Sequence, residues 1–174
     1  MPGQSRLPEP LESFVEELAL CVATNGDKGP ALLWPEDARS LSALRRLVRA
    51  GRPGTDGQGP AGEGEPPAAP GTGELAAALG RRLGLRVHPS CRSLAPRETS
   101  GPHGADGGEC TLTVLTGACR CDVSRRSRPP ARGAVLDTRL RSGDTLFVPR
   151  GHTYRLSDVH TPTLVLELAL SDTV

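Results

Sequence analysis

Apolar residues in the first part of the chain recur with the period of an α-helix. Residues 9–23 and 36–51 each carry an apolar stripe of this kind, and Asn25-Gly26 and Gly51 are residues that end helices. Residues 73–83 (GELAAALGRRL) follow the same pattern. These segments predict three amphipathic helices. The stripe of the first helix consists of Leu11, Phe14, Val15, Leu18 and Val22.

From Leu85 onward the apolar positions alternate, which is the period of a β-strand. Short alternating runs separated by Gly, Pro and Ser predict several antiparallel strands, as in a sandwich or barrel. The run GDTLFVPRGHTYRLSD, from Gly143 to Asp158, predicts a strand, a tight turn and a second strand. We therefore expect a mainly β fold, a small antiparallel barrel with two or three N-terminal helices. The remaining strands are expected at 85–88, 111–123 (bent or turned near Gly117-Ala118), 134–140 and 161–170.

Residues 52–72 separate two of the helical patterns. They contain Gly, Pro, Ala and Glu, but no Leu, Ile, Val or aromatic residue. Such a composition cannot bury enough apolar surface to offset the entropy lost on ordering. We expect a flexible linker or insertion there, a helical segment at 1–51 before it, and the barrel at 73–174 after it.

The formal net charge of +1 gives the chain no overall attraction for nucleic acid or for an anionic membrane. The N-terminus lacks the layout of a secretory signal, and no apolar run approaches the roughly 20 residues that span a bilayer. We expect a cytoplasmic protein that binds neither nucleic acid nor membrane. Lys28 is the only lysine, which suggests a GC-rich bacterial genome. Aromatic residues make up only 2% of the chain, and we expect Trp34 to anchor the N-terminal helices.

The five cysteines stand at irregular spacing and do not form a disulfide framework. Cys119 and Cys121 would point to one face of a strand, an arrangement that could suit a soft metal. No second pair completes a four-ligand zinc set. We expect these thiols to be buried as small hydrophobic side chains.

The stretch from Gly143 to Asp158 resembles the second sequence motif of the cupin superfamily. That motif places a Gly, a Pro-x-Gly turn, a histidine and an asparagine at set distances. Gly143 matches the Gly, and Pro149 and Gly151 match the Pro-x-Gly turn. The segment GDTLFVPRG, which includes Asp144, is similar in sequence to the matching segment of JmjC-type cupins of the ribosomal-oxygenase group. These are Fe(II)- and 2-oxoglutarate-dependent hydroxylases of protein side chains. The resemblance implies a turn that aims the next side chain into the barrel mouth, where the family has a metal-binding histidine.

The upstream segment PHGADGGECTLTVLTG resembles the first metal motif of the same group, with His103 at the position of the first histidine. The resemblance loosely covers most of residues 73–170. Three positions depart from the family. Ala105 stands where the family has its carboxylate, and Tyr154 stands where it has its second histidine. Cys119, with Arg120 beside it, falls near the lysine that holds 2-oxoglutarate.

Neighbouring residues could replace the missing ligands. An iron facial triad needs two histidines and one carboxylate on one metal. In a rearranged site His103, His152 and either Asp106 or Glu109 would hold Fe(II), and Arg120 would hold the carboxylate of 2-oxoglutarate as a bidentate fork.

Three functions remain open at this point. The first, which we expect, is a JmjC-like pseudoenzyme without a cofactor, which binds a peptide, a protein or a small carboxylate as an accessory to a modifying system. The second is an active Fe(II)/2-oxoglutarate hydroxylase of a peptide or protein side chain. The third is a structural module that forms a homodimer or heteromer through its barrel strands. The apolar run 163–170, with Glu167 its lone charge, is either buried on both faces or paired with a second protomer.

Overall fold

The computed structural model describes residues 7–50, 70–104, 108–126 and 134–172. Within these residues the helices are α1 (Glu9–Asn25), α2 (Ala38–Ala50) and α3 (Gly73–Leu83), with a short 3₁₀ helix at Pro70–Thr72. None of the described helices is long and apolar enough to cross a membrane. The strands are β1 (Ala31–Leu33), β2 (Leu85–Leu94), β3 (Ser100–His103), β4 (Glu109–Thr116), β5 (Ala118–Arg125), β6 (Leu136–Arg141), β7 (Thr145–Val148), β8 (His152–Ser157) and β9 (Thr163–Asp172).

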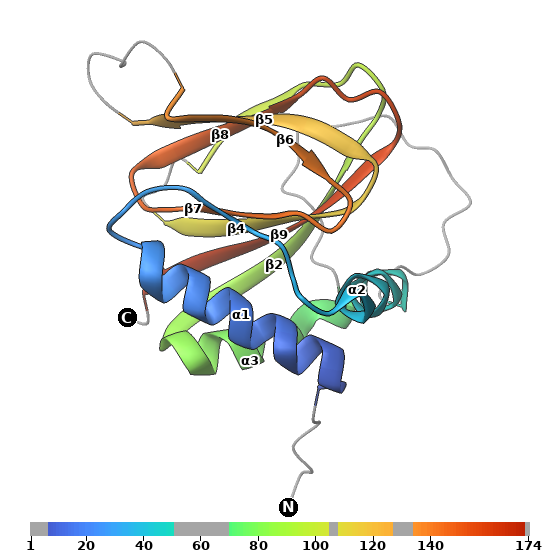
Figure 1. Cartoon of the computed structure of the whole chain (residues 1–174), viewed down its shortest axis with the longest axis vertical. Helices are drawn as coiled ribbons and strands as arrows, with labels where there is room; N and C mark the ends of the chain where they lie inside the picture. Colours follow the sequence, from blue (N-terminus) through green and yellow to red (C-terminus); the bar gives the residue numbers. More distant parts are fainter. Residues whose placement is uncertain (1–6, 51–69, 105–107, 127–133, 173–174) are drawn as a thin grey trace, which may run out of the picture.

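The strands form two sheets that face each other (Figure 1). One sheet has five strands in the order β1-β7-β4-β9-β2, and the other has four in the order β3-β8-β5-β6. All of the pairings are antiparallel. The chain crosses between the two sheets several times, so the architecture is a jelly-roll barrel. The helices lie against the outer face of the five-stranded sheet, on the side away from the other sheet (Figure 1).

The alternation of side chains along the strands creates two hydrophobic cores. On β4, Leu112 and Val114 point between the two sheets into what we call the barrel core. On β9, Val165 also belongs to the barrel core, whereas Leu166 and Leu168 point toward the helices into what we call the helix core. The five-stranded sheet therefore contributes to both cores, because successive side chains of a strand point to opposite faces.

The helices form where the sequence predicts them because each has an apolar face that packs into the helix core. The predicted stripe of α1 is buried along its length. On α3, Leu75 and Leu79 are fully buried, and the helix ends at Gly84, whose φ of 69° is left-handed. The helix predicted at 73–83 has those bounds, and α1 and α2 differ from their predicted ranges only at the ends.

The strands agree with the prediction in part. The run predicted at 111–123 turns at Gly117, which has a φ of 78°, and so forms the two strands β4 and β5. The sequence pattern does not predict β1 and β3, which are short and pair with β7 and β8. The expectation for Trp34 is wrong. Its side chain is 66% exposed, because β1 ends at Leu33 on the open edge of the five-stranded sheet.

The last strand, β9, lies in the interior of its sheet. It pairs with β2 along one edge and with β4 along the other. Its apolar run is nearly continuous because one face of the strand contacts the barrel core and the other contacts the helix core. Of the two arrangements expected for residues 163–170, burial on both faces is the one observed. A second copy could pair with β9 only by displacing β2 or β4.

The predicted helical segment and the predicted barrel share one core. The strand β1, which precedes the predicted linker, pairs with β7, and all three helices contribute to the helix core. Within the predicted linker 52–72, Pro70–Thr72 form the 3₁₀ helix and Thr72 is buried. Positions 52–69 lie outside the described residues. Residues of both ranges, 1–51 and 73–174, contribute to the helix core, and the division of the chain into these ranges stays a prediction.

Candidate functional site in the barrel interior

The stretch from Gly143 to Asp158 folds as a strand, a turn and a strand. Gly143 and Gly151 have φ angles of 98° and 77°, left-handed conformations that favour glycine. The carboxylate of Asp144 accepts a hydrogen bond of 2.7 Å from the backbone N–H of Arg141 and closes the turn before β7. These two turns set where β8 begins, and so determine which of its side chains point into the barrel.

Tyr154 points into the barrel from the middle of β8. Its side chain is 1% exposed, and its hydroxyl donates a hydrogen bond of 2.8 Å to Oε2 of Glu167 on β9. Because β8 and β9 belong to different sheets, this bond joins the two sheets across the interior. His103 lies opposite Tyr154 in the pairing of β3 with β8, and the centroids of the two rings are 5.3 Å apart.

Arg92 and Ser100 complete a polar cluster around this bond. The guanidinium of Arg92 lies 3.6 Å from Oε2 of Glu167 and donates a hydrogen bond of 3.2 Å to the hydroxyl of Ser100. The same hydroxyl lies 2.6 Å from Nε2 of His103. We call Arg92, Ser100, His103, Tyr154 and Glu167 the interior cluster.

Strand pairing explains why the two charged members of the cluster meet. Arg92 lies opposite Val165, which belongs to the barrel core, so Arg92 faces the interior as well. Glu167 is two residues after Val165 and lies on the same face of β9. The side chains of Arg92 and Glu167 are 20% and 14% exposed. The pair is thus largely enclosed by the barrel and still reachable from solvent.

Burial and charge shift the pKa values within the cluster. Burial raises the pKa of Tyr154 far above its ordinary value, and the carboxylate of Glu167 raises it further. Burial lowers the pKa of His103, and the positive charge of Arg92 lowers it further. At neutral pH the phenol is therefore an uncharged hydrogen-bond donor and the imidazole is neutral.

The cysteines of the interior are buried among apolar side chains. Cys119 and Cys121 both point into the barrel core from β5 and have no exposed surface. Burial raises the pKa of Cys119 to about 11 and raises that of Cys121 more strongly. The pKa of Cys110 is also raised, mainly by burial and next by Glu167. Protonated thiols in such a setting pack as small hydrophobic groups, which is the role that we expect of Cys119 and Cys121 from the sequence.

His152 lies on the same face of β8 as Tyr154, two residues before it. Its side chain is 8% exposed, and Nδ1 is 3.2 Å from the carbonyl of Arg150. Within the described residues, the buried Nε2 has no hydrogen-bond partner. A buried polar atom of this kind is uncommon, and it marks a position where a further group would be stabilised.

Neither of the two carboxylates proposed as iron ligands is observed beside the histidines in the part of the chain that the structure describes. Glu109 precedes Cys110 on β4, and since Cys110 points into the barrel core, Glu109 points to the opposite face. There its carboxylate lies 4.0 Å from the guanidinium of Arg150, and burial raises its pKa. Asp106 lies outside the described residues, so its role stays a prediction.

Arg120, proposed to hold 2-oxoglutarate, points away from the interior. It alternates with the buried Cys119 and Cys121 on β5, and it forms an ion pair with Asp137 on the outer face of the four-stranded sheet. A second carboxylate, that of Asp122, lies 3.6 Å from its side chain. In this arrangement Arg120 is not available to a ligand inside the barrel.

The described residues do not fit an iron facial triad. Tyr154 donates its hydroxyl to Glu167, and Nε2 of His103 contacts the hydroxyl of Ser100. No group of three His, Cys, Asp or Glu side chains able to hold a metal ion occurs among the residues that the structure describes. A triad that includes Asp106, which lies outside the described residues, stays a prediction.

Sequence reasoning misses Arg92 and Ser100. The alternation along β2 is weak, so only its pairing with β9 reveals that Arg92 faces inward. Glu167 does give a signal, because it is the lone charge in a strand that is otherwise apolar. A charged residue inside a strand with two buried faces requires a partner, and Tyr154 and Arg92 are its partners.

No family model and no curated protein matches this sequence. Among solved structures, the chain is similar to E. coli ycfD in an X-ray structure, with a TM-score of 0.51 and 19% identity. That similarity covers 88% of this chain and 52% of the other, so the chain spans about half the length of that protein.

Two further structures are similar over a smaller part of the chain. A structure of YcfD, a ribosomal oxygenase from Escherichia coli, has a TM-score of 0.44 and 22% identity over 58% of this chain and 29% of that one. The Schizosaccharomyces pombe Cnp3 cupin domain has a TM-score of 0.41 and 11% identity over 49% of this chain and 53% of that one. The similarity to ycfD and the two facing antiparallel sheets show that the chain has a jelly-roll barrel fold, the kind of fold that the sequence predicts.

Proposed function

We propose that this protein is a JmjC-like cupin without metal-dependent catalysis, and that it binds a peptide or protein at its barrel mouth. The observation that supports this proposal is the state of Tyr154. In the family that the motif resembles, this position holds a metal-binding histidine. Here it holds a buried phenol whose hydroxyl is bonded to Glu167.

The chemistry of a neutral phenol supports a binding role. A phenol coordinates a metal effectively only as the phenolate, and burial with a neighbouring carboxylate keeps the pKa of Tyr154 far above neutral. The hydroxyl is then a fixed hydrogen-bond donor that orients Glu167. The interior cluster is in this way organised by contacts among its own side chains.

The ligand would be recognised by the two charges of the cluster. Arg92 and Glu167 keep part of their surface exposed, so a peptide entering the mouth meets one cation and one carboxylate at fixed positions. The neutral imidazole of His103 adds a hydrogen-bonding group beside them. A peptide or protein is also the class of ligand that the resemblance to protein hydroxylases implies, with this chain acting as an accessory protein.

A second candidate function, an active Fe(II)/2-oxoglutarate hydroxylase, is favoured by His152 alone. Its buried Nε2 has no hydrogen-bond partner within the described residues. Together with His103 and Asp106 it would supply two imidazoles and one carboxylate, the donor set of a facial triad.

Metal analysis distinguishes the two candidates. The protein would be purified anaerobically with Fe(II), the bound metal quantified, and the measurement repeated with His103→Ala and His152→Ala. The binding proposal predicts no stoichiometric iron and no conversion of 2-oxoglutarate to succinate. Stoichiometric iron that both substitutions abolish would overturn it in favour of the hydroxylase.

The single tyrosine of the chain reports on ligand binding in the interior. With selectively ¹³C-labelled tyrosine, Tyr154 gives one NMR signal, which should shift when a peptide selected from an array of short peptides is added. The Arg92→Gln variant should bind that peptide more weakly. Arg155→Gln is the matched control, since Arg155 is an exposed arginine that follows Tyr154 on the opposite face of β8. Equal weakening by both variants would contradict recognition at the interior cluster.

A further inference from the structure

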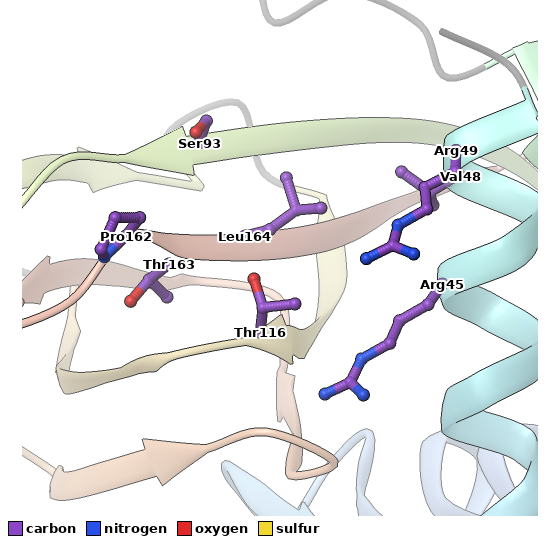
Figure 2. Close-up of a pocket in the computed structure, with 8 residues that line it drawn as sticks. All are labelled: Arg45, Val48, Arg49, Ser93, Thr116, Pro162, Thr163 and Leu164. Atoms are coloured by element: carbon purple, nitrogen blue, oxygen red, sulfur yellow. The ribbon is translucent and has the colours of Figure 1, made fainter.

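A cavity with a partly polar lining lies outside the barrel, between α2 and one end of the five-stranded sheet. Its volume is about 240 Å³. Figure 2 shows that Arg45 and Arg49 extend from α2 toward a row of strand residues. The lining consists of Arg45, Val48, Arg49, Ser93, Thr116, Pro162, Thr163 and Leu164. None of these residues belongs to the interior cluster.

The floor of this cavity, which we call the α2 pocket, is formed by three residues that lie side by side on three neighbouring strands. Leu164 on β9 lies opposite Ser93 on β2 and opposite Thr116 on β4. The three side chains therefore lie on one face of the sheet, with a hydroxyl on each side of the leucine (Figure 2). This face of the sheet is the one that α2 covers, as the packing of Leu164 against the helix core shows.

The wall of the α2 pocket is one face of the helix. Arg45 and Arg49 are four residues apart on α2 and so lie on the same side. Nε of Arg45 donates to the carbonyl of Leu115 at 2.6 Å, and Nη2 donates to the hydroxyl of Ser142 at 2.6 Å. These bonds hold the guanidinium of Arg45 in place, and its Nη1 takes part in neither of them. Arg49 is exposed and has neither an ion pair nor a hydrogen bond among the residues that the structure describes.

The charges of the pocket are not balanced by its own lining. Among the residues that the structure describes, its lining includes two arginines and no Asp or Glu. Like charges four residues apart on a helix repel each other, so the arrangement carries a cost that a bound anion would offset. Guanidinium groups bind carboxylates and phosphates through paired N–H donors, and the hydroxyls of Ser93 and Thr116 add donors on the floor.

The size and walls of the pocket distinguish among anions. A cavity of about 240 Å³ is smaller than the roughly 300–1,000 Å³ of typical ligand pockets, so it suits a small ligand, or the end of a larger one, better than a whole nucleotide. Val48, Leu164 and Pro162 give it apolar walls that an inorganic anion would leave uncovered. We propose that the α2 pocket binds a carboxylate with a short aliphatic body, such as a small branched acid or the C-terminal residue of a polypeptide.

The test is a calorimetric titration of the full chain with N-acetyl-leucine at low ionic strength. We expect saturable binding that weakens when salt is added, because the arginines are partly exposed. N-acetyl-leucinamide, which has the same body without the carboxylate, should not bind. Inorganic phosphate should bind more weakly than N-acetyl-leucine. A short peptide that ends in leucine distinguishes the two sources of the carboxylate. Tighter binding of the peptide than of N-acetyl-leucine assigns the pocket to a protein C-terminus, and equal binding assigns it to a small acid.

Two variants of the same helix connect the binding to the pocket. Arg49→Gln should weaken N-acetyl-leucine binding by about tenfold, the value of one lost hydrogen bond to a charged group. Arg46→Gln removes the same charge from an exposed residue that is not part of the pocket lining and that donates a hydrogen bond to the carbonyl of Ser42 in its own helix, so it should leave binding unchanged.

The proposal would be overturned by absence of N-acetyl-leucine binding, by equal binding of the acid and its amide, or by equal loss in the Arg46 and Arg49 variants. Tighter binding of phosphate than of N-acetyl-leucine would also overturn the assignment to a carboxylate.

Discussion

At the scale of single residues, Tyr154 and Glu167 depend on each other. The carboxylate of Glu167 lies in a largely apolar barrel, where an unpaired charge would be costly, and the phenol is one of its two partners. The phenol in turn is held in its protonated form by burial and by that carboxylate. A tyrosine at this position therefore agrees with a carboxylate on the facing strand.

The raised pKa of Tyr154 predicts how stability depends on pH in alkaline solution. In the unfolded chain the phenol loses its proton near its ordinary pKa of about 10, whereas in the folded protein it keeps the proton. The unfolded state then binds fewer protons, so the free energy of unfolding falls as the pH rises above about 10, by up to about 1.4 kcal/mol per pH unit for this group. Below that pH the contribution of the phenol is fully present. Buried thiols such as Cys119 add to the fall.

Urea unfolding at several values between pH 9 and 11.5 measures this dependence. The Tyr154→Phe variant is the control, because it keeps the ring and removes the titrating proton. We expect its stability to fall less steeply than that of the wild-type protein. Since Tyr154 is the only tyrosine, phenolate absorbance at 295 nm should appear together with unfolding. Phenolate absorbance in a fully folded protein at pH 10 would contradict the buried, bonded state of Tyr154.

At the scale of elements, α1 offers two leucines in opposite environments. Leu18 is 0% exposed within the helix core, and Leu20 is 69% exposed on the other side of the same helix. Leu18→Ala removes a packed side chain and should lower the free energy of unfolding by about 2–5 kcal/mol. Leu20→Ala should change it by no more than about 0.5 kcal/mol. Thermal and urea unfolding of the two variants measure the difference, and similar losses in both would show that α1 packs through a different face.

The turn between β4 and β5 depends on Gly117 in two ways. Its φ is 78°, which disfavours any side chain, and a Cβ there would lie 2.7 Å from the carbonyl oxygen of Pro162. Gly151 has nearly the same φ, 77°, but a Cβ would meet nothing within 4 Å. Gly151→Ala should therefore cost only the left-handed conformation, about 1–2 kcal/mol. Gly117→Ala should cost clearly more, because the backbone before β9 must also move. Equal costs in urea unfolding would contradict the close approach of these two segments.

The elements also show how far the sequence predicts this fold. Helix positions follow from local periodicity, and so do the longer strands, because each must place one or two faces in a core. β1 and β3 are too short for a pattern and exist because distant strands pair with them. The same limit applies to the site. The inward direction of Tyr154 follows from the motif, but the inward direction of Arg92 follows only from the pairing of β2 with β9.

At the scale of the whole molecule, the five-stranded sheet is a layer shared by two cores. Its inner face closes the barrel, and its outer face is covered by helices that come from both sides of the predicted linker. The outer face contributes Leu115, Phe147, Leu166, Leu168 and Leu170 to the helix core. The sheet that holds Glu167 is therefore supported from the side opposite to the interior cluster.

This shared layer predicts that the barrel segment does not fold by itself. Burial of one large apolar side chain contributes about 1.5–3 kcal/mol, so uncovering five of them would remove on the order of 10 kcal/mol. That amount is comparable to the whole stability of a typical domain, about 5–15 kcal/mol. A chain of residues 70–174 would also lack β1 and leave an edge of β7 unpaired. It should show no cooperative unfolding transition and no dispersed NMR spectrum, and it should bind a hydrophobic dye.

Addition of a peptide of residues 1–50 should restore cooperative unfolding, and the same peptide with Phe14→Asp, which places a charge at a fully buried position, should not. If residues 70–174 alone unfolded cooperatively, the helices would be an accessory to the barrel and not part of its core.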